Sequence, residues 1–195
     1  MAIYLKDSKT KENLMKAFAG ESQARNRYTF AAEEARKQKM YSVADVFAFT
    51  AEQERAHAER YYDLLKEMAG ETIEICGGFP VDHYDDLGKL LKAAKHNEFE
   101  EYEDVYQNFG DIAKEEGFME IAATFYQIAE VEKTHGNQFE KIAEMLEAVS
   151  YTHLASRRSR VRISLSPLDS KRNLMCTLKI AYRNEMIRKI SRHPR

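Results

Sequence analysis

Apolar residues recur at three- and four-residue intervals along four stretches of the chain, which is the spacing of one face of an α-helix. Proline interrupts none of these stretches, so each one predicts a single long helix. The four helices predict an all-α fold, a four-helix bundle whose apolar faces turn inward. The predicted helices span about residues 8–38, 42–68, 87–115 and 118–147.

The segment between the second and third predicted helices, residues 70–86, breaks the helical pattern. It contains Gly77, Gly78 and Pro80, and residues 72–75 form a short β-like run. A connection of about 17 residues is too long for a tight antiparallel turn. It suits a long crossover between helices two and three, which makes these helices parallel neighbours.

Two of the predicted helices carry a glutamate and a histidine three residues apart, as Glu54 with His57 and Glu132 with His135. Positions i and i+3 share one helix face, so each pair can close on a single point. A lone pair of this kind is a weak signal, because a solvated face offers the same spacing. The neighbours favour an inward position, since Glu54 and His57 align with the apolar face that includes Phe47.

Each Glu-x-x-His pair follows another glutamate at a similar interval. Glu54 lies 33 residues after Glu21, and Glu132 lies 34 residues after Glu98. Glu101 shares the helix face of Glu98, three residues further on. A solvated acidic face suits the remaining carboxylates of this region. His83 and His96 do not follow a glutamate three residues earlier, so they are predicted to lie on the surface. The carboxylates assigned to that solvated face are Glu100, Glu103 and Asp104.

Seven side chains are therefore candidates for one shared site. Five carboxylates are too many acidic groups for a dry bundle core unless cations neutralise them. A glutamate from each of two helices with a Glu-x-x-His from each of the other two is typical of di-iron or di-manganese sites in ferritin-like bundles. Oxygen-rich ligation favours iron or manganese over a thiolate zinc site, with Glu54 and Glu132 bridging and Glu21 and Glu98 terminal. The seven candidates are Glu21, Glu54, His57, Glu98, Glu101, Glu132 and His135.

Cysteine usage and hydropathy indicate the cellular compartment of the protein. The chain has two cysteines, Cys76 and Cys176, and no Cys-x-x-Cys motif, which argues against a disulfide framework. The opening residues are charged too early for a secretory signal, and no apolar run is long enough to cross a membrane. We therefore expect a cytoplasmic protein without a membrane partner, in which Cys76 is a structural or incidental thiol.

Charge divides the chain near residue 150. Residues 1–150 hold 18 Lys and Arg against 30 Asp and Glu, whereas residues 151–195 hold 12 against 2. We assign the bundle to residues 1–147 and an atypical basic tail to residues 148–195. A basic tail can contact nucleic acid or an anionic surface. We instead expect a non-native segment with no nucleic-acid partner, because A-V-S-Y-T-H-L at 148–154 resembles the translated end sequence of transposase-based sequencing libraries.

Four motifs, in order and suitably spaced, resemble those of rubrerythrins over about residues 5–147. The resemblance implies a ferritin-like four-helix bundle and a non-haem centre of two iron ions that reduces hydrogen peroxide to water. It also implies that Tyr28 and Tyr106 hydrogen-bond the ligating carboxylates, and that Glu101 exchanges with His57 as a ligand when the centre is oxidised. The motifs are G-E-S-Q-A-R-N-R-Y at 20–28, E-R-A-H at 54–57, E-F-E-E at 98–101 and A-E-V-E-K-T-H at 129–135.

In the tail the sequence departs from the usual rubrerythrin pattern. Rubrerythrins usually carry a rubredoxin domain with two Cys-x-x-Cys pairs, but residues 148–195 contain only Cys176 and are not predicted to form that domain. We therefore expect an external electron donor such as a rubredoxin-like protein, unless the true gene continues past the fusion point. By analogy with related bundles, we also expect a homodimer. Two other functions fit the helices: a ferroxidase or iron-handling protein that uses dioxygen, and a structural bundle without metal.

Overall fold

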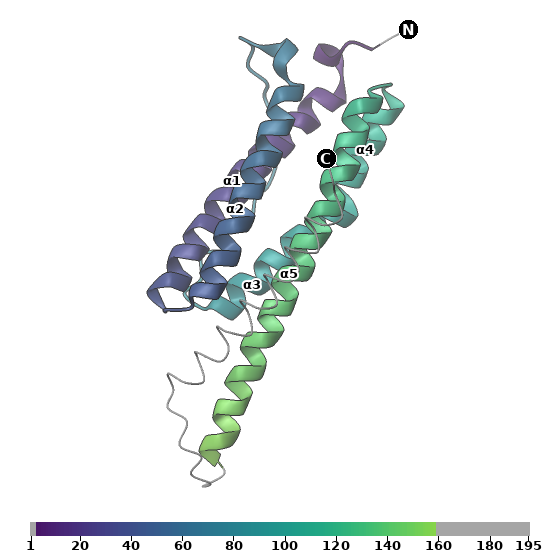
Figure 1. Ribbon diagram of the computed structural model, residues 1–195. Helices are drawn as coiled ribbons and strands as arrows, with labels where there is room; N and C mark the ends of the chain where they lie inside the picture. Colours follow the sequence, from purple (N-terminus) through teal and green to yellow (C-terminus); the bar gives the residue numbers. More distant parts are fainter. Residues whose placement is uncertain (1–2, 159–195) are drawn as a thin grey trace, which may run out of the picture.

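The computed structural model describes residues 3–158, and these residues form helices and connecting segments without a β-strand (Figure 1). The all-α prediction is confirmed. Within these residues no helix combines the length and the apolar character that a membrane crossing requires. Short 3-10 turns occupy Leu5–Asp7 and Lys66–Met68. The long helices are α1 (Lys9–Lys37), α2 (Tyr41–Leu64), α3 (Leu87–Glu100), α4 (Tyr106–Glu115) and α5 (Met119–Arg158).

Helix α1 has a well-defined start and stop. The Ser8 hydroxyl accepts a hydrogen bond from the Lys11 amide at 3.1 Å, so it satisfies one of the unpaired donors of the first turn. At the other end Lys39 adopts a left-handed backbone with φ 62°, and the Met40 amide returns to the Ala35 carbonyl. The chain thereby reverses direction within a few residues, and α2 packs antiparallel to α1 (Figure 1).

The connection between α2 and α3 is the predicted crossover. Gln38, just after α1, donates a hydrogen bond from Nε2 to the Asp85 carbonyl at 2.6 Å. Helix α3 therefore begins at the end of the bundle where α1 and α2 meet, and it runs parallel to α2. The prediction of a β-like run at residues 72–75 is wrong, because no strand pairs with this mostly exposed segment among the described residues.

The third predicted helix is interrupted. Residues Glu101–Val105 form a π-helical segment between α3 and α4, and the Tyr106 amide donates to the Glu101 carbonyl five residues earlier. A π segment adds one residue to a turn, so it changes which side chains face inward on either side of it. The sequence predicted a continuous helix over 87–115 because periodicity does not resolve one inserted residue.

The fourth predicted helix is longer than expected. Helix α5 continues to Arg158, past the predicted end at residue 147 and beyond the ends of its neighbours (Figure 1). Neither glycine nor proline occurs between residues 137 and 158, so no helix-breaking residue ends the helix at residue 147. Residues 159–195, including Cys176, lie outside the described part of the chain, so the assignment of the tail remains a prediction.

Two apolar clusters occupy the interior of the bundle, one toward each end. On α1, α2 and α5, and along the chain from α3 to α4, the candidate ligands fall between the segments that contribute to the two clusters. Glu21, for example, lies between Ala17 of one cluster and Ala24 of the other. The bundle therefore encloses a polar layer between two apolar layers. The largest fully buried members are Phe47, Leu91 and Phe139 in one cluster and Tyr61, Tyr106 and Phe125 in the other.

Candidate metal centre

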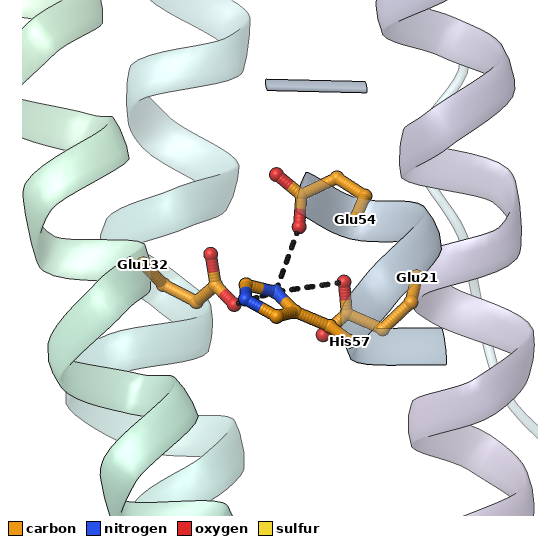
Figure 2. A group of neighbouring side chains, drawn as sticks. All are labelled: Glu21, Glu54, His57 and Glu132. Carbon is orange, nitrogen blue, oxygen red and sulfur yellow. Dashed lines mark hydrogen bonds and ion pairs between the residues drawn. The ribbon is translucent and has the colours of Figure 1, made fainter. Parts of the chain in front are cut away.

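The polar layer holds two groups of four side chains, and in each group the candidate ligand atoms lie within 4.8 Å of one another. Glu54 and Glu132 belong to both groups, as expected for bridging carboxylates. Figure 2 shows the first group, in which side chains from α1, α2 and α5 converge. The groups are Glu21, Glu54, His57 and Glu132, and Glu54, Glu98, Glu132 and His135.

Three carboxylates surround the imidazole of His57. Its Nδ1 lies 2.8 Å from Glu132 Oε1, 3.1 Å from Glu54 Oε2 and 3.7 Å from Glu21 Oε2 (Figure 2). One ring N–H can donate to one of these oxygens but not to all three. The convergence is thus more than a histidine requires for its own hydrogen bonding.

His135 repeats the arrangement in the second group. Its Nδ1 lies 2.8 Å from Glu132 Oε2, 3.1 Å from Glu54 Oε1 and 3.2 Å from Glu98 Oε2. The other ring nitrogen, Nε2, lies 3.0 Å from the side-chain oxygen of Gln53. If Nε2 carries the proton and donates it to Gln53, the Nδ1 lone pair faces the carboxylates, as a metal ligand requires.

The residues present fit two divalent cations. Ligand atoms bound at about 2.1 Å around an octahedral cation are separated by about 3 Å, which matches most of the distances around the two Nδ1 atoms. Both oxygens of Glu132 and one oxygen each of Glu21 and Glu54 are buried without a hydrogen-bond partner among the described residues. Buried carboxylate oxygens need a partner, and a cation at the centre of each group provides one.

The charges of the metal-free groups lead to the same conclusion. Burial raises the pKa of Glu21 and of Glu98 well above the ordinary value, and neighbouring carboxylates raise both further. Burial also opposes ionisation of Glu54, but contacts with His135 and His57 outweigh it and lower the Glu54 pKa to about 2. The metal-free centre therefore keeps protons that bound cations would displace, which couples metal affinity to pH.

Two buried tyrosines hold the terminal carboxylates, as the resemblance implied. The Tyr28 hydroxyl donates to Glu98, and the Tyr106 hydroxyl donates to Glu21. Burial raises the pKa of both phenols, and the nearby carboxylates raise it further, so both remain protonated donors. These hydrogen bonds fix one oxygen of each carboxylate, and the other oxygen of each faces the histidine Nδ1 of its ligand group.

Glu101 is the one candidate that joins neither group. It is half-buried and occupies the first position of the π segment. Burial raises the pKa of its carboxyl, and the Glu21 and Glu98 carboxylates add to this effect, so Glu101 lies close to the centre. In this structure His57, rather than Glu101, faces the first group.

The sequence prediction missed Gln53, and it placed Tyr61 on the apolar face of Glu54 and His57 without a role at the site. Gln53 contacts His135 from α2, and its position four residues before His57 placed it near the same helix face. Tyr61 is fully buried one turn beyond His57, against the ring of Tyr106 at a centroid distance of 5.6 Å. Other surface predictions are confirmed, because His83, His96, Glu100, Glu103 and Asp104 are exposed.

Comparisons with known proteins identify the family of the chain. The rubrerythrin family model matches residues 12–143 and also residues 89–194. Rubrerythrin of Clostridium perfringens is 46% identical over 144 residues, which cover 73% of this chain and 74% of the relative. Rubrerythrin of Porphyromonas gingivalis is 47% identical over 135 residues, covering 69% of this chain and 66% of the relative.

Solved structures share the fold. The fully reduced, all-ferrous state of nigerythrin superimposes with a TM-score of 0.63 at 29% identity, over 73% of this chain and 72% of that chain. Symerythrin from Cyanophora paradoxa, at 22% identity and a TM-score of 0.62 over 75% of this chain and 88% of that chain, supports the fold alone. With its ferritin-like helical bundle and its paired carboxylate and histidine groups, the chain belongs to the iron-binding rubrerythrin family.

Proposed function

We propose that this protein is a non-haem di-iron peroxidase that reduces hydrogen peroxide to water with electrons from an external donor. The observation that carries the proposal is the sharing of Glu54 and Glu132 by both ligand groups. Shared carboxylates hold two cations next to each other, so both can act on one small substrate. When bound, a pair of ferrous ions supplies the two electrons that cleavage of the O–O bond requires.

The protein residues position the ligands. Tyr28 and Tyr106 restrain the terminal carboxylates from one side, and Gln53 restrains the His135 ring through Nε2. The buried layer between two apolar clusters keeps bulk water away from the ligands. Peroxide reduction consumes two protons as well as two electrons, and the product is two molecules of water.

We propose that Glu101 would take the place of His57 in holding a bound cation once the centre is oxidised. Glu101 lies in the π segment beside the centre, and His57 is the least buried of the six clustered ligands, with a side chain 12% exposed. A carboxylate compensates the higher charge of ferric iron better than a neutral imidazole does. The exchange would stabilise the oxidised centre, and His57 would become a ligand again when the centre is reduced.

The proposal also includes the electron donor, the oligomeric state and the cellular compartment. A rubredoxin-type iron needs four thiolates, which the two cysteines of these 195 residues do not supply. We propose a rubredoxin-like protein as the electron donor. A homodimer built through the helices is proposed by analogy with related bundles. A cytoplasmic location suits the free, exposed thiol of Cys76.

Comparing two oxidants tests the proposal. The protein is loaded anaerobically with two ferrous ions per chain and mixed in a stopped-flow instrument with hydrogen peroxide or with dioxygen. A peroxidase is oxidised much faster by peroxide, with the ferric absorption band appearing at one peroxide per two irons. Faster oxidation by dioxygen, with release or storage of ferric iron, would support a ferroxidase instead.

A further inference from the structure

A cavity of about 290 Å³ lies beside the metal centre, between α1, the π segment and the crossover. The carboxylate of Glu101 and the ring of Tyr106 border it on the side of the centre. Since Tyr106 also donates to Glu21, the cavity reaches a residue that contacts the first ligand group directly. Polar side chains also line it, those of Lys16, Arg27, Asn97 and Glu100, but most of the wall surface is apolar. The apolar part is formed by Ala17, Gly20, Phe79, Pro80, Val105 and Phe109.

Gly20 opens the α1 wall of this cavity. A glycine inside a helix costs about 1 kcal/mol relative to alanine. A Cβ atom added to Gly20 would lie 3.9 Å from the Phe79 ring, an ordinary contact, so no described neighbour requires a glycine at this position. The missing side chain instead leaves volume in the cavity that a larger residue would fill.

Asp82 holds the crossover over the cavity. Its Oδ2 accepts a hydrogen bond from Asn97 Nδ2 at 2.7 Å and lies 3.2 Å from a guanidinium nitrogen of Arg27. Asn97 belongs to α3 and Arg27 to α1, so one carboxylate ties the crossover to both helices. Phe79, 38% exposed, and the exposed Cys76 line the cavity and also reach solvent, so the cavity opens there.

The volume exceeds what hydrogen peroxide needs. A water molecule occupies about 30 Å³ in the liquid, so a molecule with two oxygen atoms requires on the order of 60 Å³. A cavity of about 290 Å³ is close to the size of small-molecule ligand sites, which begin at roughly 300 Å³. Its apolar walls suit an alkyl group, and its inner end suits the peroxide oxygens.

We infer that this cavity binds short alkyl hydroperoxides and that the protein reduces them to alcohols. The reaction breaks the O–O bond of ROOH, consumes two electrons and two protons, and yields ROH and one water. The electrons come from the same external donor, because the inference rests on the proposed peroxidase function. Glu101 and Tyr106 lie between the alkyl site and the ligands.

Oxidation rates of the diferrous protein test the inference with hydrogen peroxide and tert-butyl hydroperoxide. The wild-type protein should react with both. Gly20→Leu fills the cavity and should slow the reaction with tert-butyl hydroperoxide on the order of tenfold, while the rate with hydrogen peroxide stays within about twofold. Gly20→Ala, which adds only a Cβ atom, is the matched control, and all variants should still bind two irons per chain.

Chemical blocking of Cys76 gives a second test without a change in the helix. N-ethylmaleimide should slow the reaction of the wild-type protein with tert-butyl hydroperoxide. The same treatment of Cys76→Ser controls for modification of Cys176 and should have no effect. Equal slowing of both proteins would contradict a substrate site beside Cys76.

Xenon binding provides a readout that needs neither iron nor turnover. Xenon enters apolar cavities, so crystals of the metal-free protein under xenon pressure should show a site between Gly20 and Phe79 that Gly20→Leu abolishes. An empty cavity under xenon would overturn the inference.

The two oxidants separate failure of the inference from failure of the proposed function. Oxidation of the wild-type protein by hydrogen peroxide but not by tert-butyl hydroperoxide would overturn the inference and leave the proposed function intact. Failure of both oxidants would contradict the proposed function itself.

Discussion

The hydroxyl of Tyr106 on α4 donates a hydrogen bond to the carboxylate of Glu21 on α1, 85 residues earlier in the chain. Tyr106 is 1% exposed and Glu21 is fully buried, so water cannot replace this contact. The bond orients one terminal ligand of the first group and joins the two halves of the bundle at the centre.

Tyr106→Phe should weaken iron binding in the first group by about tenfold, because loss of a hydrogen bond to a ligand typically reduces metal affinity by 10- to 100-fold. Competition with a chelator of known affinity measures the effect. Tyr126→Phe is the control, since Tyr126 donates to Asp111 on the exposed surface of the bundle. Equal iron affinities in the two variants would show that the Tyr106 contact does not support the ligand.

Glu101→Ala should bind iron nearly as well as the wild-type protein, because Glu101 is outside both ligand groups. It should nevertheless slow peroxide turnover, since the ligand exchange with His57 would be lost. Iron content and steady-state peroxidase rates measure the two effects. Glu103→Ala, in the same π segment but exposed, is the control, and wild-type rates in Glu101→Ala would argue against the exchange.

Glu116 at the end of α4 caps the first turn of α1 from a distance. Its carboxylate accepts from the amides of Lys9 at 2.9 Å and Thr10 at 2.8 Å, and from the Thr10 hydroxyl. Loss of such a cap typically costs about 1 kcal/mol, so Glu116→Gln should lower the free energy of unfolding. Burial alone would raise the Glu116 pKa, but these hydrogen bonds outweigh it and lower the pKa.

The lowered pKa predicts how the effect depends on pH. A carboxylate whose pKa is lower in the folded than in the unfolded state stabilises the folded protein. The contribution is complete above the unfolded pKa, about 4.3, and it is lost as the pH falls through the folded pKa. The difference in unfolding free energy between the wild-type protein and Glu116→Gln should therefore shrink between neutral pH and about pH 3. Glu115→Gln, exposed one residue earlier, is the control, and a constant difference would contradict the assignment.

Lys39 is a position where substitution should stabilise the protein. Its φ of 62° lies in the left-handed region, which a side chain disfavours by about 1 kcal/mol and glycine adopts freely. Lys39→Gly should raise the melting temperature. Lys37→Gly, in the last helical position of α1, should lower it, because glycine in a right-handed helix loses more backbone entropy. A lower melting temperature for both variants would rule out strain at Lys39.

The sequence predicted much of the fold and most of the centre because two periodic features coincide. Apolar periodicity located four helices, and the Glu-x-x-His spacing identified faces that were also apolar. Glu54 and Glu132 were placed on those faces, and the structure buries both. Periodicity works here because each ligand occupies the inward face of a long helix.

Other features depend on contacts that periodicity does not encode. One inserted residue creates the π segment and sets Glu101 apart from Glu98. The cavity arises from Phe79 and Pro80 of an irregular segment, held in place by a hydrogen bond from Asn97 to Asp82. Such placements follow from tertiary packing, so they become visible only in three dimensions.

Mössbauer spectroscopy of the protein reconstituted with ⁵⁷Fe tests most directly whether two cations share Glu54 and Glu132. Two irons per chain should bind, and after oxidation both should belong to one magnetically coupled diferric pair with a diamagnetic ground state. Glu132→Ala removes a carboxylate that belongs to both groups, so it should abolish the coupled pair. One iron per chain, or two irons that behave as independent ferric ions in the wild-type protein, would contradict the shared centre.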